Sequence, residues 1–308
     1  MSKMNFKQFA EEVKNHLLEG WREDAALEIK PVYKENGKIL TSLIVFRKEE
    51  KLNPTFYLEP YFQNYQEGYP IHVVLVKLRA DYDKACEDLM EESSMPNFEN
   101  WEDVKDRLIL RLVNFQRSRE MFESGDVIYE RFLEDMAVTI RCVVKNTEEG
   151  MYSVLVERSL ADHWGVTDDE ILKIAKANTG RLYPPVFFPL DSFVEEEEGS
   201  GECEEINPIF GLTNKAHFFG ATSLILTNAL TKIGEKFGNL YLVPNCVHEI
   251  IVLPEALFPD PSVLASILYD ANRSEIKEED FLSDTVYMYR ASDDCLAPVS
   301  LGDNQMLS

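Results

Sequence analysis

Residues 26–46 read ALEIKPVYKENGKILTSLIVF and carry the clearest structural signal in the chain. Two runs rich in β-branched and aromatic residues, 26–33 and 39–46, lie on either side of Glu35-Asn36-Gly37. Asn and Gly tolerate positive φ, so this centre predicts a tight turn between two strands. The segment therefore predicts an antiparallel β-hairpin.

Amphipathic helical patterns lie on both sides of this hairpin. Apolar residues recur at helical spacing over 5–18 and again over 71–89. Residues 4–90 thus have the order helix–strand–strand–helix. We expect the same order at 221–272 and a looser version at 115–178, without repetition of residue identity. The predicted class is α+β, with antiparallel hairpins flanked by helices and helix–strand–strand–helix as a candidate repeated unit.

Alternation and capping signals predict the remaining elements. Residues 136–145 alternate between two faces and predict a strand, with a partner strand at 151–157. Thr167 and Glu170 form a capping box that begins a helix, which Gly180 is expected to end. The other expected elements are a strand at 208–212, a helix at 221–237, strands at 240–243 and 247–253, a helix at 261–272 and a strand at 285–289.

We divide the chain into an N-terminal helix–hairpin–helix unit, 1–95, and a C-terminal α+β region, 96–308. The C-terminal region contains an acidic stretch at about 191–206, where seven of the eleven residues 195–205 are glutamate. Low hydrophobicity and mutual repulsion predict a mobile loop there. A calcium site is the alternative, but the ligand spacing and the glycine of an EF-hand loop are missing.

The net charge is strongly negative. The 308 residues include 55 acidic and 31 basic side chains, which give −24 at pH 7. Such a surface repels phosphate backbones and anionic lipids, so we expect no direct binding to nucleic acid or to a membrane. Solubility through mutual repulsion is one interpretation. The sharper alternative is a protein that imitates a polyanion and occupies a DNA-binding partner.

The cysteines indicate a reducing compartment. Their number is odd, and no two of them form a C-x-x-C pair, so neither a disulfide framework nor a cysteine zinc site is indicated. The first residues lack the apolar core of a signal peptide, and no apolar run is long enough to cross a bilayer. We therefore expect a soluble cytoplasmic protein. The five cysteines are Cys86, Cys142, Cys203, Cys246 and Cys295.

Motifs for cofactors and activated nucleophiles are missing from the sequence. It contains no Walker loop, no G-x-G-x-x-G and no G-x-S-x-G. The histidines are too far apart in sequence to suggest a metal pair. We expect neither a cofactor nor a metal.

Two groups of residues are weak candidates for a site. His248-Glu249 resembles the opening of a metalloprotease helix, but position 252 is Val252, and the segment predicts a strand. A satisfied polar residue on a strand is the alternative to catalysis. Tyr57, Tyr61 and Tyr65 are spaced four apart and are expected to share one helical face, either as a binding surface or as core packing.

Several segments together resemble the bacterial domain-of-unknown-function family numbered 5688. Its most specific block is P-x-x-x-H-E-x-I at 244–251, where this chain has Asn245 and Cys246 in place of two expected serines. The resemblance covers nearly the whole chain and implies no activity, cofactor or partner. The other segments that carry it are 54–65, 211–214, 220–221, 240–243 and 282–289.

Three hypotheses for function follow. The first is a non-enzymatic protein-interaction module, because catalytic motifs are missing and a tyrosine-rich segment is present. The second is a hydrolase-type enzyme that uses His248 together with a carboxylate brought near by the fold. The third is an acidic mimic of DNA. The sequence leaves the oligomeric state open.

Overall fold

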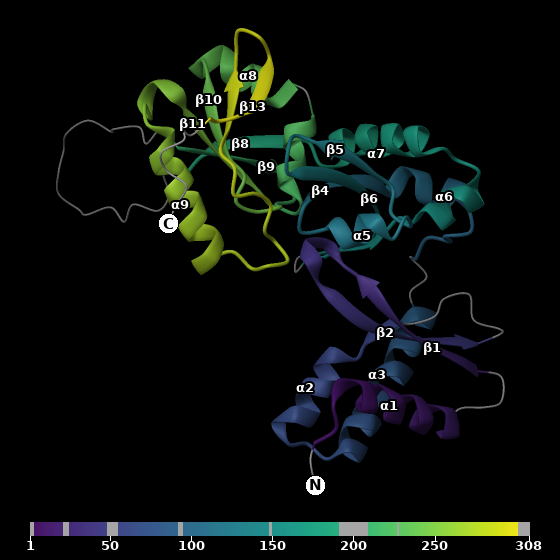
Figure 1. Ribbon diagram of the computed structural model, residues 1–308. Helices are drawn as coiled ribbons and strands as arrows, with labels where there is room; N and C mark the ends of the chain where they lie inside the picture. Colours follow the sequence, from purple (N-terminus) through teal and green to yellow (C-terminus); the bar gives the residue numbers. More distant parts are fainter. Residues whose placement is uncertain are drawn as a thin grey trace, which may run out of the picture. The chain divides into compact units, whose positions relative to one another are not determined.

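The computed structural model (Figure 1) describes residues 3–20, 25–47, 55–91, 95–147, 150–190, 209–226 and 228–300. Contacts divide the chain into two compact units, Met1–Met95 and Pro96–Ser308. Helices and antiparallel sheets occur in both units, which makes the protein α+β. The acidic stretch at 191–206 lies outside the described residues.

The N-terminal unit has one antiparallel sheet in the order β1–β2–β3. Asn36 and Gly37 adopt φ values of 61° and 75° between Tyr33 and Ile39, which are paired, so the expected hairpin is confirmed. The elements of this unit are α1 (Phe6–Gly20), β1 (Ala25–Tyr33), η1 (Glu35–Gly37), β2 (Ile39–Arg47), β3 (Thr55–Tyr57), α2 (Glu59–Glu67) and α3 (Ile71–Glu91).

One apolar cluster forms the core of this unit. The stripe predicted on α1 is buried at Phe9, Val13 and Leu17, and it packs with Leu43 of β2 and Leu78 of α3. All five side chains are removed from water, and burial of a large apolar side chain stabilises a fold by roughly 1.5–3 kcal/mol. The helices therefore hold the hairpin by covering one face of its sheet.

The first half of the C-terminal unit is a four-stranded sheet. β6 is the longest strand and pairs with β4 on one side and with β5 and β7 on the other. The elements are α4 (Trp101–Val104), η2 (Lys105–Arg107), β4 (Leu108–Asn114), α5 (Arg119–Glu123), β5 (Tyr129–Phe132), β6 (Met136–Thr147), β7 (Gly150–Leu155), α6 (Arg158–Trp164) and α7 (Asp168–Leu182).

Strand β4 lies at the edge of this sheet and is buried along its whole length. The backbone amides on its free edge do not form hydrogen bonds with another described strand. The Leu110 amide donates to Thr179 Oγ1 at 2.9 Å, and the Leu112 amide donates to Thr222 Oγ1 at 3.3 Å. Buried amides need partners, and threonine hydroxyls from α7 and from the following half of the unit supply them. β4 was not predicted, because a strand buried on both faces shows no alternation.

The second half of this unit is a six-stranded antiparallel sheet in the order β13–β12–β10–β11–β9–β8. Within it, α8, β10, β11 and α9 follow one another in the expected helix–strand–strand–helix order. The elements are β8 (Pro185–Pro189), β9 (Phe210–Asn214), η4 (Gly220–Ile225), α8 (Asn228–Phe237), β10 (Leu240–Val243), β11 (Ile250–Pro254), η5 (Glu255–Leu257), α9 (Pro261–Ser274), β12 (Tyr287–Arg290) and β13 (Cys295–Pro298).

Helices α8 and α9 cover opposite faces of this sheet (Figure 1). Leu240 and Leu242 belong to the cluster that contains Ile233 of α8, whereas Tyr241 and Val243 belong to the cluster that contains Leu268 of α9. Successive side chains of a strand point to opposite faces, so one short strand serves two cores. This explains why all four residues of β10 are apolar and buried.

Three predicted boundaries in this unit are wrong. The helix expected at 221–237 is split, because η4 occupies Gly220–Ile225 and α8 begins at Asn228. Helix α7 has the predicted capping box but continues through Gly180. The strand expected at 247–253 begins only at Ile250, so His248 precedes β11.

Candidate functional site

His248 lies in the connection between β10 and β11. Two backbone contacts join this connection to the segment before β12: the Val247 amide donates to the Asp280 carbonyl at 2.8 Å, and Cys246 forms an isolated bridge with Phe281. We call residues 213–220, 246–249 and 280–283 the His248 corner. The corner brings together three segments that are distant in sequence.

The His248 ring is held on both nitrogens. Nε2 lies 3.1 Å from Asp280 Oδ1, and Nδ1 accepts a hydrogen bond from the Phe219 amide at 3.4 Å. With Nδ1 as the acceptor, the neutral ring donates its Nε2 proton to Asp280. The side chains of His248 and Asp280 are 32 % and 28 % exposed. The acidic partner is thus Asp280, and the neighbouring Glu249 is not the group that orients the ring.

The loop before η4 closes tightly over this histidine. Phe219 stacks on the ring at 6.1 Å between centroids, and the Arg111 guanidinium lies 4.3 Å from the centre of the Phe219 ring. His217 and Phe219 both have positive φ, which is unusual for large side chains. A Cβ on Gly220 would lie 2.3 Å from the His248 carbonyl oxygen, so only glycine fits there.

The nucleophilic side chains around His248 are occupied. Thr213 Oγ1 donates to the His248 carbonyl at 2.7 Å, and Ser223 Oγ donates to the Thr213 carbonyl at 2.9 Å. Burial raises the pKa of the Cys246 thiol, although the backbone amides of His248 and Glu249 counteract part of this effect. A raised pKa leaves little reactive thiolate near neutral pH. The His248 corner therefore has an oriented imidazole but no activated nucleophile among these neighbours.

An acidic side chain anchors the segment that follows Asp280. Asp135, in the turn between β5 and β6, accepts from Ser283 Oγ and from the Tyr287 hydroxyl, each at 2.5 Å. Burial and the Asp135 carboxylate raise the pKa of Tyr287, so this hydroxyl stays a donor. Hydrogen bonds to a carboxylate are among the stronger ones in proteins. This network fixes the four-stranded sheet to the six-stranded sheet.

The three candidate tyrosines have different surroundings in the N-terminal unit, and only Tyr61 and Tyr65 belong to or pack against its core. Tyr57 lies on β3, so the single helical face expected for the three residues is wrong. Tyr61 is buried on α2 and donates to Asp81 Oδ2 at 2.8 Å, and burial together with that carboxylate raises the pKa of Tyr61. Tyr65 accepts from the Met4 amide at 3.0 Å. A binding role for them stays a prediction.

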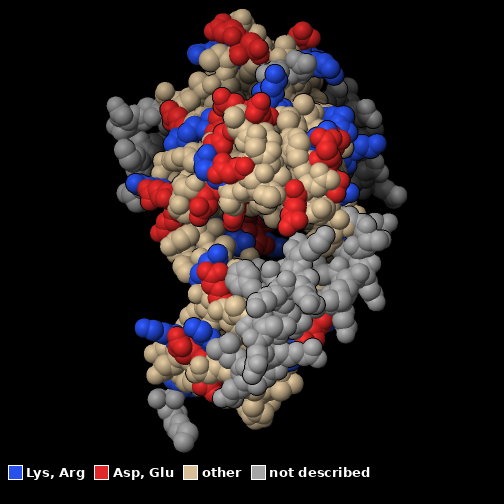
Figure 2. Space-filling model, turned by 90° about the vertical axis from the view of Figure 1, so that its right-hand side faces the viewer, with Lys and Arg blue, Asp and Glu red and all other residues tan. Residues whose placement is uncertain are grey.

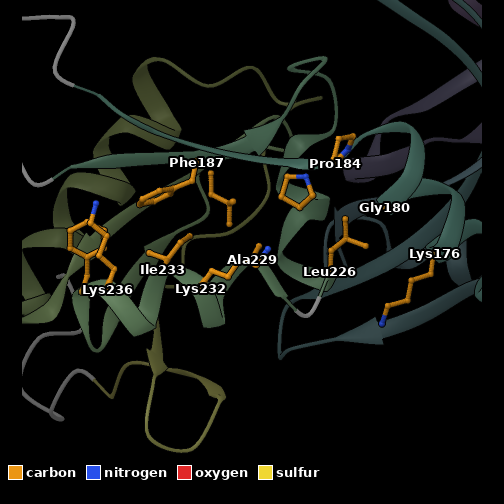
Figure 3. Close-up of a pocket in the computed structure, with 12 residues that line it drawn as sticks. Lys176, Gly180, Pro184, Phe187, Leu226, Ala229, Lys232, Ile233 and Lys236 are labelled. Carbon is orange, nitrogen blue, oxygen red and sulfur yellow. The ribbon is translucent and has the colours of Figure 1, made fainter.

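Sequence reasoning missed a cavity in the C-terminal unit (Figure 3). This cavity, which we call the lysine pocket, has a volume of about 610 Å³ and lies between α7, β8, β9 and α8. Its walls are mainly apolar and include Phe187, Leu226, Ile233 and Phe237. Cavities of roughly 300–1,000 Å³ are the size that small ligands occupy.

Three cations border this apolar space: Lys176 from α7, and Lys232 and Lys236 from α8. Among the described residues, no acidic side chain lines the pocket. Within the described residues, no carboxylate forms an ion pair with any of the three ammonium groups. The described charged side chains that line the pocket are therefore all basic, whereas acidic side chains outnumber basic ones in the chain as a whole.

Gly180 explains why the cavity is open at α7. It lies inside the helix and borders Leu226 across the pocket, where an added Cβ would sit 3.8 Å from Leu226 Cδ2. Glycine within a helix costs about 0.5–1 kcal/mol relative to alanine. This glycine lies at the position where a larger side chain would project into the pocket. A glycine inside an otherwise regular helical pattern was the signal that could have revealed the site.

Two further observations concern metal-binding groups and membrane-spanning helices. In the described part of the chain, no group of three or more His, Cys, Asp or Glu is placed to hold a metal ion. None of the described helices combines the length and the apolar composition needed to cross a membrane.

Comparisons with known proteins identify a family but no characterised relative. The model of DUF5688, a family of unknown function, matches residues 6–291. Neither the curated proteins nor the solved structures contain a match to the chain. The chain therefore belongs to the DUF5688 family.

Proposed function

We propose that this member of the family binds a small amphipathic organic anion in the lysine pocket and works by binding rather than by catalysis. The observation that carries the proposal is the pocket lining, in which three lysines and no acidic residue of the described ranges surround an apolar cavity. In a chain of net charge −24, such a lining favours an anion over a cation or a neutral ligand.

The two parts of such a ligand have different partners. The apolar walls bury a hydrocarbon portion, and each buried methylene contributes about 0.8 kcal/mol. The lysines are flexible point charges, which suits a carboxylate or a phosphate better than a rigid planar group. The exposed position of the lysines places the charged end of the ligand toward solvent.

Calorimetric titration with hexanoate, octanoate and decanoate tests the proposal. Affinity should rise by about fourfold for each methylene that the pocket buries. Lys236→Glu should weaken decanoate binding by about fivefold to tenfold, because an attractive charge becomes a repulsive one. Lys173→Glu is the matched control, since Lys173 is exposed on α7 but does not line the pocket.

Two outcomes would contradict the proposal. One is the absence of saturable binding of any of these acids to the intact protein. The other is equal weakening by Lys236→Glu and by Lys173→Glu, which would indicate a general effect of net charge. Melting temperatures of both variants show whether either substitution disturbs the fold.

A hydrolase-type activity at His248 is the second candidate. The 3.1 Å contact between His248 and Asp280 favours it, because a carboxylate that orients an imidazole is part of many acid–base sites. It ranks second because both ring nitrogens have partners within the protein. Turnover of ester substrates that is lost in His248→Ala and in Asp280→Asn, with the fold retained, would support it. No turnover by the unmodified protein would exclude it for those substrates.

The prediction of a protein-interaction module is compatible with ligand binding and remains part of our proposal, as does a cytoplasmic location. Cys142, Cys246 and Cys295 are unpaired, which supports a reducing compartment. The DNA-mimic hypothesis receives less support. On the face of the C-terminal unit shown in Figure 2, acidic and basic side chains alternate around an uncharged patch and form no continuous acidic row.

A further inference from the structure

The lysines of the pocket are distributed along its length. Figure 3 places Lys176 of α7 at one end, beyond Gly180, and Lys236 of α8 at the other end, with Lys232 between them. Apolar residues, among them Leu226 and Ile233, separate the two ends. A ligand with a single charged head would have a partner at one end and leave the other end unused.

We infer that the ligand carries two anionic groups joined by an apolar spacer, as in a straight-chain dicarboxylate. This inference rests on the proposed function, because it assigns the chemistry of a ligand in the same pocket. Lys236 and Lys232 bind one anionic group, the apolar walls bury the spacer, and Lys176 binds the second group. Such a ligand spans from α7, which packs on the four-stranded sheet, to α8, which packs on the six-stranded sheet.

The second anionic group gives the inference a sharp physical consequence. A carboxylate in place of a terminal methyl group loses hydrophobic burial and must be partly removed from water. In a pocket with cations at one end only, a dicarboxylate therefore binds more weakly than the monocarboxylate of the same length. A cation at the far end offsets this loss, and it does so for the dicarboxylate more than for the monocarboxylate.

The test compares decanoate with sebacate, its dicarboxylate of equal length, by calorimetric titration of the full-length protein. Because one exposed ion pair contributes up to about 1 kcal/mol, we expect Lys176 to raise the ratio of sebacate affinity to decanoate affinity by about threefold to fivefold. Lys176→Gln should lower this ratio by the same factor, because the substitution weakens sebacate binding more than decanoate binding. Lys173→Gln on the same helix should leave both affinities unchanged.

The outcomes separate this inference from the function on which it rests. Equal weakening of both acids by Lys176→Gln, or no weakening of either, would overturn the two-anion inference and leave the pocket function standing. Failure of both acids to bind would overturn the pocket function itself.

Discussion

The His248 corner and the lysine pocket border the same strand, β9, but they are built in opposite ways. In the corner, Gly220 has no room for a Cβ, and the polar side chains bond to one another or to the backbone. In the pocket, Gly180 has room for a Cβ at an ordinary contact distance from Leu226, and the lysines have no acidic partner among the described residues. The contrast teaches that a glycine and a few polar groups can indicate either packing or binding, depending on whether their partners lie inside the protein.

The strongest test of this contrast is Gly220→Ala. The new methyl group would overlap Thr213 Oγ1 at 2.0 Å and the His248 carbonyl at 2.3 Å, and a backbone atom cannot move aside as a flexible side chain can. We expect a loss of about 3 kcal/mol in the free energy of unfolding, near the upper end for overpacking. Urea denaturation measures it. An unchanged midpoint would show that the corner is looser than the contacts indicate.

The next largest effect is expected for Tyr287→Phe. This substitution removes the hydroxyl that donates to Asp135 and leaves a partly buried carboxylate with one donor fewer. Loss of a hydrogen bond to a charged group costs about 1.5–3 kcal/mol. Decanoate binding should stay as in the unmodified protein, since Tyr287 does not line the pocket. A loss of binding with unchanged stability would mean that the anchor and the pocket are linked.

Gly180→Ala makes the same chemical change as Gly220→Ala at the open site. The added Cβ meets Leu226 at an ordinary contact distance, and alanine favours the helix, so stability should rise by about 0.5–1 kcal/mol. The methyl group also narrows the lysine pocket, so decanoate should bind more weakly. Thermal unfolding and titration measure the two effects. A destabilisation similar to that of Gly220→Ala would show that Gly180 is packed as tightly as Gly220.

The smallest expected effect is the pH dependence of stability that comes from Asp284, which directly follows the His248 corner. Burial alone would raise the pKa of Asp284, but hydrogen bonds from Arg273 and Asn272 and the charges of Arg273 and Arg117 outweigh it and lower the pKa below 3.8. Because the pKa of Asp284 is lower in the folded protein than in the unfolded chain, the ionised carboxylate stabilises the fold at pH values above its ordinary pKa. This stabilisation is lost as the pH falls through the folded-state pKa.

Asp284→Asn isolates this contribution. The unmodified protein should be more stable than the variant at neutral pH, by about 1 kcal/mol or less because the pair is partly exposed. The difference in melting temperature should shrink as the pH falls below 3.8, the ordinary pKa of the side chain. A difference that stays constant with pH would assign the effect to packing instead of charge.

Local signals account for the parts of the fold that the sequence predicts. The Asn36-Gly37 hairpin and the Thr167 capping box are determined by residues a few positions apart, and both are confirmed. The segment η4 was missed because long-range contacts determine its backbone: the Ala221 amide donates to the Val247 carbonyl at 3.2 Å, and Thr222 Oγ1 accepts from the Leu112 amide at 3.3 Å. Tertiary contacts of this kind override helix propensity and leave no local signal.

The candidate site was predictable only in part. His248 could be chosen from its neighbours in sequence, but its partner Asp280 lies 32 residues away and could not. The lysine pocket was missed because its three lysines belong to helices on two different sheets. Exposed lysines at helical spacing are ordinary on any solvated helix face. They become unusual only when the fold places them around one apolar cavity.

The threonine hydroxyls that cover β4 have a consequence for biosynthesis. They come from residues 69 and 110 positions further along the chain than the amides they bind. Until those residues leave the ribosome, a largely apolar strand presents unpaired amides to the surrounding solvent, which is the arrangement that recruits other strands. Nascent chains that stop before Thr222 should therefore aggregate or depend on chaperones. In the folded 308-residue chain, the same strand should not promote aggregation.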